Sequence, residues 1–363
     1  MWWPNGIQRA ERADRLRLPG QPLLRPRAPL GVPGVRRLRP PVDAEVDRSV
    51  SILPSAAEHP VRLAVSTGSY EKGSASAAFH LGIEVGSSTL HRLVASEAPH
   101  VEDSLADQAA AMLETGVCPE VRVDLQGEDL CLAIDGGHVS ERGGNTFEIK
   151  SAVAWTGVSR GSQGRSGLCG REGYAALEPA SDFFPKVLAA AIRNGCLSAG
   201  RTIVLANGAD WIRNGVAALL PGALYVLDWT HLERRVREVL CRPEDGGTLA
   251  SVLDACRRCE PAEALTLLRQ WATPHDDRRL YRRLLRYLRI NAEGIANHAL
   301  VDIHGLGAIE KAVDLIVSRR YKLRGMSWST KGAAALLPFM VLLYNRTWKQ
   351  HWDPRVASLP HAA

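Results

Sequence analysis

Three polar side chains directly follow apolar runs that are typical of strands. Asp135 ends the run in "LAIDGG", Asn207 ends the run in "VLANGA", and Asp228 ends the run in "VLDWTH". In sheets with parallel strands, ligand sites gather beyond the carboxyl ends of the strands. A strand that runs into a carboxylate and then glycines suits cation binding, although Asp135 can equally be a turn aspartate before Gly136 and Gly137.

Glu310 is the other acidic residue that is a candidate for metal binding or catalysis. It lies in "GLGAIEKAVDLIVSRR", beside the apolar stripe of a predicted helix and just after its glycine-rich entry. The alternative is a first-turn acid that the helix dipole favours. Asp135, a strand-end position and Glu310 together suggest two-metal phosphoryl transfer, because two Mg²⁺ ions about 4 Å apart need roughly three carboxylates to offset their charge.

The elements that must position these residues alternate between strands and helices. We expect two strands within 121–139, the second ending near Asp135, and a long Gly/Ser loop over 156–173. Further strands are predicted over 146–155, 202–206 and 223–228, and helices over 182–194, 209–220 and 229–240. After residue 245 the pattern is helical, over 250–270, 276–290, 306–322 and 329–346, with a break at Trp328 and an N-cap at Ser329. This order predicts an α/β fold with parallel strands and helices on the faces of the sheet.

A glycine-punctuated pair of helices precedes this region. Helical spacing from Ser74 to Leu81 is broken by Gly82, and Ser87 can N-cap a second helix. The spacing fits a DNA-binding helix-turn-helix, and an ordinary helical hairpin is the alternative. In the first interpretation the second helix presents Ser87, Ser88, Thr89, His91 and Arg92 to a DNA groove.

The positive charge is clustered, which favours a polyanionic partner. The formal net charge is +6, and a dense basic cluster runs "RRLYRRLLRYLR" over 278–289. A further cluster consists of Arg319, Arg320, Lys322 and Arg324. Nucleic acid is the first candidate partner and a membrane surface the second, and solvated helix faces are the neutral alternative.

Other features restrict the class of protein. No apolar run approaches the roughly 20 residues of a membrane span, and no secretory signal is visible, so we expect a cytoplasmic protein without a membrane partner. The 7 Cys are scattered, which suggests reduced thiols. Cys256 and Cys259 form a CxxC without a second pair, so a metal site there, with Cys241 and His231 as companions, is a weak alternative.

The ordered set of motifs resembles insertion-element transposases of the DDE type, in the Mutator-like group. The segments that carry the resemblance are "AIDGGHV…FEIKSAVAWTG", "IVLANGADWIRNGVAALLPGALYVLDWTHLERRV" and "GAIEKAVDLIVSRRYKLRGMSW", within about 120–352. The resemblance implies a ribonuclease H-like mixed sheet flanked by helices, with Asp135 and Glu310 as catalytic acids and Mg²⁺ or Mn²⁺ as cofactor. It further implies that Asp228 and His231 form an accessory signature, that DNA is the partner, and that the protein forms homo-oligomers on DNA.

The second catalytic Asp of such enzymes falls where this chain has Asn207. An amide keeps the shape and one carbonyl ligand but brings no charge, so the resemblance implies weakened metal binding at Asp135, Asn207 and Glu310 and impaired catalysis. Asp210 lies three residues further on, in the first turn of the next helix, and should point elsewhere. The Arg/Pro-rich residues 1–45 have the character of a disordered arm or of out-of-frame coding, which suggests a decayed copy of a mobile element.

The expected domain organisation follows from these segments. It comprises an arm (1–45), a helix-turn-helix-like region (46–118), a catalytic core (119–240), a helical insertion (241–304), C-terminal core helices (305–352) and a tail (353–363). The leading functional hypothesis is a transposase that cleaves and joins DNA strands. A catalytically dead DNA-binding remnant or repressor, and a nuclease or resolvase of the same core fold, are the alternatives.

Overall fold

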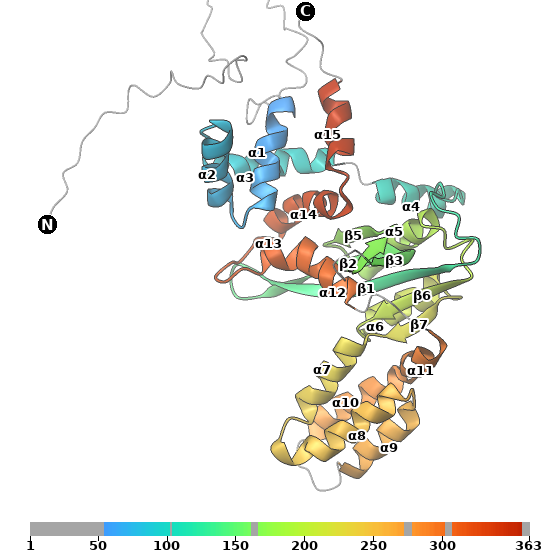
Figure 1. Cartoon of the computed structure of the whole chain (residues 1–363). Coiled ribbons are helices and arrows are strands. Elements are labelled where there is room, and N and C mark those ends of the chain that lie inside the picture. The colour runs from blue at the N-terminus through green and yellow to red at the C-terminus, as the bar shows by residue number, and fades with distance from the viewer. Residues whose placement is uncertain (1–53, 102–103, 161–165, 272–277, 302–306, 358–363) are drawn as a thin grey trace, which may run out of the picture. The chain divides into compact units, whose positions relative to one another are not determined.

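The computed structural model describes residues 54–101, 104–160, 166–271, 278–301 and 307–357 (Figure 1). The chain divides into two compact units, one of residues 1–102 with 346–363 and one of residues 103–345. The predicted arm at 1–45 lies outside the described residues. Within the described residues, no helix has the length and apolar character needed to cross a membrane.

The first unit is helical. Its helices are α1 (Pro54–Ser66), α2 (Tyr70–Leu81), α3 (Ser87–Glu97), the short η2 (Ala98–His100) and α15 (Trp348–Ala357). Ser69 caps α2 by accepting a hydrogen bond from the Lys72 backbone N–H, and Gly82 ends α2 with a left-handed φ of 67°. Gly86 is the N-cap of α3, so the predicted capping role of Ser87 was wrong; Ser87 is the first residue of the helix. Recognition of DNA by this helix pair stays a prediction.

The second unit is built on a mixed five-stranded sheet. Its strands, in the spatial order β5-β2-β1-β6-β7, are β5 (Glu172–Ala176), β2 (Thr146–Trp155), β1 (Asp129–Ser140), β6 (Arg201–Ala206) and β7 (Leu224–Leu227). β2 is antiparallel to both β1 and β5, whereas β6 is parallel to β1 and to β7. A mixed sheet of this kind, flanked by helices, is consistent with the expected ribonuclease H-like fold.

Helices cover both faces of this sheet. On one face, Leu130, Leu132 and Ile134 of β1 are fully or almost fully buried in a core that includes Phe183. That core involves α4 (Ser104–Thr115), α5 (Ala180–Arg193) and α6 (Asp210–Leu219). On the other face, α12 (Ala308–Val313) contacts β1 and β2, and α14 (Thr330–Asn345) contacts β5. The alternating side chains of β1 therefore enter two different layers.

Asp135 does not end its own strand, contrary to the sequence-based expectation. β1 continues to Ser140 because β2 pairs with it along its whole outer length, as far as the Ser140–Thr146 pair. The parallel partner β6 stops earlier, at the Ile134–Ala206 pair. Asp135 therefore lies inside β1 but at the level where the parallel neighbours end.

Two further predictions about strands were wrong in part. Residues 121–128 form no strand, and β1 is a single strand that starts at Asp129. The predicted loop over 156–173 contains a short antiparallel pair, β3 (Gly157–Arg160) and β4 (Ser166–Cys169), and also the start of β5. These strands were not predicted because the segment is rich in glycine and serine, so the alternation of apolar and polar residues that indicates a strand is weak there.

The region after β7 is helical as predicted. Its helices are α7 (Trp229–Val239), η3 (Pro243–Asp245), α8 (Gly246–Arg257), α9 (Pro261–Trp271), α10 (Arg278–Ile290), α11 (Ala292–Ala296) and η4 (Asn297–Leu300). The predicted helix over 250–270 is divided into α8 and α9, and α11 and η4 were not predicted. α12 continues through a π-helical turn, η5 (Asp314–Ser318), into α13 (Arg319–Tyr321). The predicted N-cap of α14 is confirmed, because Ser329 Oγ accepts a hydrogen bond from the Gly332 N–H at 3.1 Å.

The burial of β1 predicts that truncating one of its core side chains strongly lowers the free energy of unfolding. Leu132 is 1% exposed in the core, whereas Leu197 in the same unit is 66% exposed. We expect Leu132→Ala to lower the free energy of unfolding by about 2–5 kcal/mol, because it removes buried methyl groups and leaves a cavity. Leu197→Ala should change it by less than about 0.5 kcal/mol. Urea unfolding followed by far-UV circular dichroism measures both, and equal effects would contradict the assignment of β1 to the core.

Candidate functional site

The strand register brings three polar side chains to one level of the sheet. Ile134 pairs with Ala206, and Ala206 pairs with Leu227. The residues that follow these three are Asp135 within β1, Asn207 after β6 and Asp228 after β7, and the Asp228 N–H donates to the Ala206 carbonyl at 2.8 Å. Neighbouring strands lie about 4.8 Å apart, so these three residues form a row across β1, β6 and β7.

The turn after β6 fixes the orientation of the Asn207 amide. Asn207 Oδ1 accepts a hydrogen bond from the Ala209 N–H at 2.8 Å, which is the geometry of an Asx-turn. Since the backbone N–H requires an acceptor, the amide nitrogen must point the other way, and Nδ2 donates to Asp135 Oδ1 at 2.5 Å. Asn207 thus meets Asp135 as a hydrogen-bond donor, with its carbonyl oxygen already engaged.

Gly208 explains why this turn can form. Its φ is +84°, in the left-handed region that favours glycine. A Cβ on Gly208 would lie 2.6 Å from the ring of Tyr287, so no larger residue fits without displacing α10. The Tyr287 hydroxyl in turn donates to the Asn207 carbonyl at 3.0 Å. The turn is therefore held by the helical region as well as by its own side chain.

Asp228 is the N-cap of α7 and is almost completely buried. Its Oδ1 accepts from the backbone N–H of His231 at 3.0 Å and lies 2.9 Å from His231 Nδ1. Burial by itself would raise the pKa of Asp228, but the hydrogen bonds from the ring and the backbone of His231 outweigh it and lower that pKa. Asp228 is therefore ionised at neutral pH.

His231 spans two of the carboxylates. Its Nδ1 faces Asp228, and its Nε2 lies 3.6 Å from Asp135 Oδ2. Burial opposes protonation of the ring, but the hydrogen bond to Asp228 and the charges of Asp135 and Asp228 prevail and raise the pKa of His231. The imidazole thus partly offsets a locally negative site.

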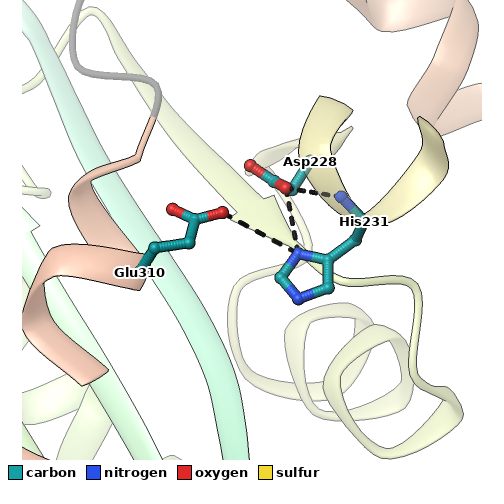
Figure 2. A group of neighbouring side chains, drawn as sticks. All are labelled: Asp228, His231 and Glu310. Atoms are coloured by element: carbon teal, nitrogen blue, oxygen red, sulfur yellow. Dashed lines mark hydrogen bonds and ion pairs between the residues drawn. The ribbon is translucent and has the colours of Figure 1, made fainter. Parts of the chain in front are cut away.

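Glu310 reaches the same place from α12. It lies in the first turn of α12, after Gly307, whose φ is +91°. Figure 2 shows its carboxylate directed toward His231, with Glu310 Oε1 4.0 Å from His231 Nδ1. Both Glu310 oxygens are shielded from solvent and accept no hydrogen bond from a described residue. Burial, followed by the charge of Asp228, raises the pKa of Glu310.

The donor set fits a divalent cation. Asp228, His231 and Glu310 each offer one ligand atom, and these atoms lie within 4.8 Å of one another. Shielded carboxylate oxygens without hydrogen bonds are costly unless a positive charge compensates them. Among the described residues this is the one group of acidic, His or Cys side chains with metal-ligand spacing. It does not include Cys256, Cys259 or Cys241.

The side chains of the predicted basic cluster over 319–324 lie in different environments. Lys322 approaches the site, because a Cβ on Gly137 would lie 3.7 Å from its Nζ. Partial burial lowers the pKa of Lys322, against the charge of Asp135. Arg319 is exposed and pairs with Asp314 at 2.9 Å, and Arg324 is exposed.

Arg320 cannot line a DNA path in this arrangement, so this part of the prediction is corrected. Its side chain is 2% exposed, and its guanidinium lies 4.9 Å from the centre of the Trp328 ring. A long cationic side chain packs well on an aromatic face, which accounts for its burial. The alternation of basic and apolar letters in "RRYKLRG" could not show which arginine points inward.

The residues predicted to contact DNA from the helix pair lie on α3 of the first unit. Ser88, His91 and Arg92 are exposed, whereas Ser87 and Thr89 are half-buried. Arg92 donates to Thr89 Oγ1 at 3.3 Å. Their role stays a prediction, and it concerns a different unit from the carboxylates.

Sequence reasoning missed three residues that support the site. Ser151 pairs with Asp135 across β1 and β2, and its buried hydroxyl makes no hydrogen bond with a described residue. Tyr287 and Asn291 of the α10 region hold the turn at Asn207 and Gly208. No local signal identifies them, because they lie about 80 residues beyond the turn in the sequence.

Comparison with known proteins places this chain in a family. The model of the Uncharacterised protein family (UPF0236) matches residues 42–353. The chain belongs to this family. No match was found among curated proteins. Among solved structures, the Drosophila P element transposase strand transfer complex aligns over 82% of this chain and 80% of that chain, at 10% identity and a TM-score of 0.26. A TM-score of 0.26 is too low to show a shared fold.

The raised pKa of His231 predicts a pH-dependent stability of this UPF0236 protein without divalent cations. A histidine with a raised folded-state pKa stabilises the fold fully below its unfolded value of about 6.5, and that contribution is lost as pH rises through the folded value. The raised pKa of Glu310 acts in the same direction at lower pH. We therefore expect the free energy of unfolding to fall as pH rises above about 6.5, and His231→Gln to flatten this fall.

Urea unfolding between pH 6 and 9 in the presence of a chelator measures the effect. His138→Gln is the matched control, because His138 is exposed on β1. An equal slope in the wild type and in His231→Gln would show that His231 does not carry this dependence.

Proposed function

We propose that this chain is a DDE-type DNA transposase whose catalysis is impaired by Asn207. The observation that carries the proposal is the row of Asp135, Asn207 and Asp228 at one level of the sheet, with Glu310 directed toward it from α12. The motif resemblance supports the same acids in the same order. Divalent cations at this row would assist hydrolysis of a phosphodiester bond, which frees a 3′ hydroxyl. They would also assist attack of that hydroxyl on a phosphodiester of the target strand, which joins the two strands and releases a 3′ hydroxyl of the target.

Asp135 and Glu310 are the proposed catalytic acids, and Asn207 occupies the position between them in sequence. Phosphoryl transfer needs carboxylates that offset the charge of Mg²⁺ or Mn²⁺ and leave room for the phosphate. The amide of Asn207 brings no charge, and its Nδ2 already donates to Asp135 Oδ1 at 2.5 Å. A weakly active or inactive enzyme follows from this arrangement.

DNA is the proposed partner, and a basic stripe on α10 supports it. The exposed arginines of α10 repeat at intervals of three and four, which places them on one helix face. They are Arg279, Arg282, Arg283, Arg286 and Arg289. Arg286 pairs with Asp210 at 3.4 Å, and the other four form no ion pair with a described residue.

The stripe is tied to the candidate site. Tyr287 on α10 donates to the Asn207 carbonyl, and Asn291 donates to the Gly208 carbonyl at 3.5 Å. A cleft of about 480 Å³ is lined by Gly208 and Asp210 near the turn and by residues of α7 and α10, among them Arg235, Arg283 and Arg286. A phosphate backbone on the stripe would pass beside the turn that carries Asn207. The exposed Arg319, Lys322 and Arg324 are proposed as further phosphate contacts.

Restoring the missing charge tests the catalytic proposal. We expect Asn207→Asp to raise strand cleavage and strand transfer at least tenfold in Mg²⁺ or Mn²⁺, because a carboxylate at this position offsets cation charge next to Asp135. The double variants Asn207→Asp with Asp135→Asn and Asn207→Asp with Glu310→Gln should lose the gained activity. The assay measures cut and joined products on DNA that carries the terminal repeats of the element.

The outcomes separate the proposed function from its alternative. DNA binding without cleavage in both the wild type and Asn207→Asp would favour a catalytically dead DNA-binding remnant. Cut strands without joined strands would favour a nuclease.

The salt dependence of DNA binding tests the stripe. Each lost phosphate contact lowers the slope of log K against log salt by about 0.9. Changing Arg279, Arg282 and Arg283 together to Gln should therefore reduce the slope by up to about 2.7. Fluorescence anisotropy with duplex DNA measures it. The matched control changes three exposed arginines that are already paired with acids, Arg234, Arg237 and Arg258. An equal reduction in the control would contradict a specific role of α10.

A further inference from the structure

Three side chains of the candidate site form a compact ligand set that includes an imidazole. Asp228 Oδ1 and His231 Nδ1 lie 2.9 Å apart, and His231 Nδ1 and Glu310 Oε1 lie 4.0 Å apart (Figure 2). A divalent ion with bonds of about 2.0–2.2 Å holds adjacent ligand atoms about 3 Å apart and opposite ones about 4.3 Å apart. These two separations fall within that range, and all three ligand atoms lie within 4.8 Å of one another, so side-chain adjustments of about 0.5 Å or less would close the set on one ion.

Asp135 is arranged differently. Its Oδ1 accepts hydrogen bonds from Asn207 Nδ2 at 2.5 Å and from the Gly136 N–H at 2.7 Å. Its Oδ2 faces His231 Nε2 at 3.6 Å. A histidine that binds a metal through one ring nitrogen commonly presents the other ring N–H to a carboxylate, which fixes its tautomer and orientation. Asp135 has the position of that orienting carboxylate, and Asn207 holds Asp135 in turn.

We infer that, in the absence of DNA, Asp228, His231 and Glu310 bind one divalent transition-metal ion. In this state Asp135 is the positioning residue for His231, and Asn207 is the positioning residue for Asp135. This inference rests on the proposed function for the presence of a cation at the site. It goes further in naming the ligands and the class of metal. The ligand set uses Asp228 in place of the carboxylate that is missing at position 207.

The shielded oxygens of Glu310 support this assignment independently of the row of acids. Neither oxygen accepts a hydrogen bond from a described residue. His231 Nδ1 and Asp228 Oδ1 are the described ligand atoms that Glu310 faces in Figure 2. A cation between these three side chains would compensate the charge of the Glu310 carboxylate.

The imidazole determines which metal the set prefers. Mg²⁺ favours oxygen ligands and near-ideal octahedral geometry, whereas first-row transition metals accept nitrogen as well. Two carboxylates and one imidazole should therefore bind Mn²⁺ at least tenfold more tightly than Mg²⁺. One ion per chain is expected, because the Asn207 amide occupies the place where a second cation would need a carboxylate.

The experiment is a titration of the full chain with Mn²⁺, without DNA. Electron paramagnetic resonance of free Mn²⁺ gives the affinity and stoichiometry, and pulsed measurements detect coupling of bound Mn²⁺ to a ¹⁴N nucleus. We expect one bound ion with ¹⁴N coupling in the wild type. Asp228→Asn, His231→Gln and Glu310→Gln should each weaken Mn²⁺ binding at least tenfold, and ¹⁴N coupling should be absent from any ion that His231→Gln retains.

Asp135→Asn and Asp210→Asn are the comparison variants. The first removes the charge of the positioning carboxylate but keeps an acceptor, so it should weaken Mn²⁺ binding less than Asp228→Asn does. The second changes an exposed acid that pairs with Arg213 and Arg286, and binding should not change. Circular dichroism and thermal unfolding of every variant show whether it remains folded.

Two results would overturn the inference. One is bound Mn²⁺ in the wild type without ¹⁴N coupling, a result that does not depend on the folding of any variant. The other is loss of Mn²⁺ binding in Asp135→Asn together with full binding in a folded Asp228→Asn or His231→Gln. Mn²⁺ bound as expected, but without DNA cleavage even in Asn207→Asp, would instead refute the proposed catalysis and leave the metal site standing.

Discussion

The repulsion between carboxylates in a small, poorly solvated space is the constraint on which the site depends. Asp135, Asp228 and Glu310 surround a single imidazole, and two of these acids are buried. Like charges at this distance raise the cost of ionisation unless a positive charge or hydrogen-bond donors offset it. The surrounding structure supplies such donors at Asp135 and Asp228, but none from a described residue at Glu310. The charges of Asp135 and Asp228 are therefore offset within the protein, whereas that of Glu310 is not.

The same constraint gives Asn207 a physical role. An aspartate at this position would place a second negative charge next to Asp135, whereas the amide donates a hydrogen bond there. In the proposed enzyme, the same amide that would weaken cation binding thus relieves repulsion in the absence of cations. Stability and catalysis make opposite demands on this residue, as is common where binding sites keep like charges close together.

The helical region after β7 is coupled to the site through the turn at Asn207 and Gly208. Tyr287 packs against Gly208 and donates to the Asn207 carbonyl, so the position of the amide depends on α10 as well as on the sheet. The basic stripe of α10 lies beside Tyr287, because Arg283 and Arg286 line the same cleft as Tyr287 and Gly208, and it would connect phosphate contacts to that turn. Binding of a polyanion and the geometry of the carboxylates are therefore expected to be linked through one helix.

The sequence by itself determined most of the order of strands and helices, except near 121–128 and 157–169, because apolar periodicity and the glycine, serine and asparagine turn signals are local. It also identified the four side chains at 135, 207, 228 and 310 as candidates, since three directly follow apolar runs and the fourth lies near the start of a predicted helix. Only the tertiary structure decided that β1 continues past Asp135, because pairing with β2 extends the strand beyond the local turn signal. Only the tertiary structure decided the direction of the Asn207 amide, the bridging position of His231 and the burial of Arg320. These depend on the register between strands and on contacts between residues that are distant in the sequence, and no local pattern encodes them.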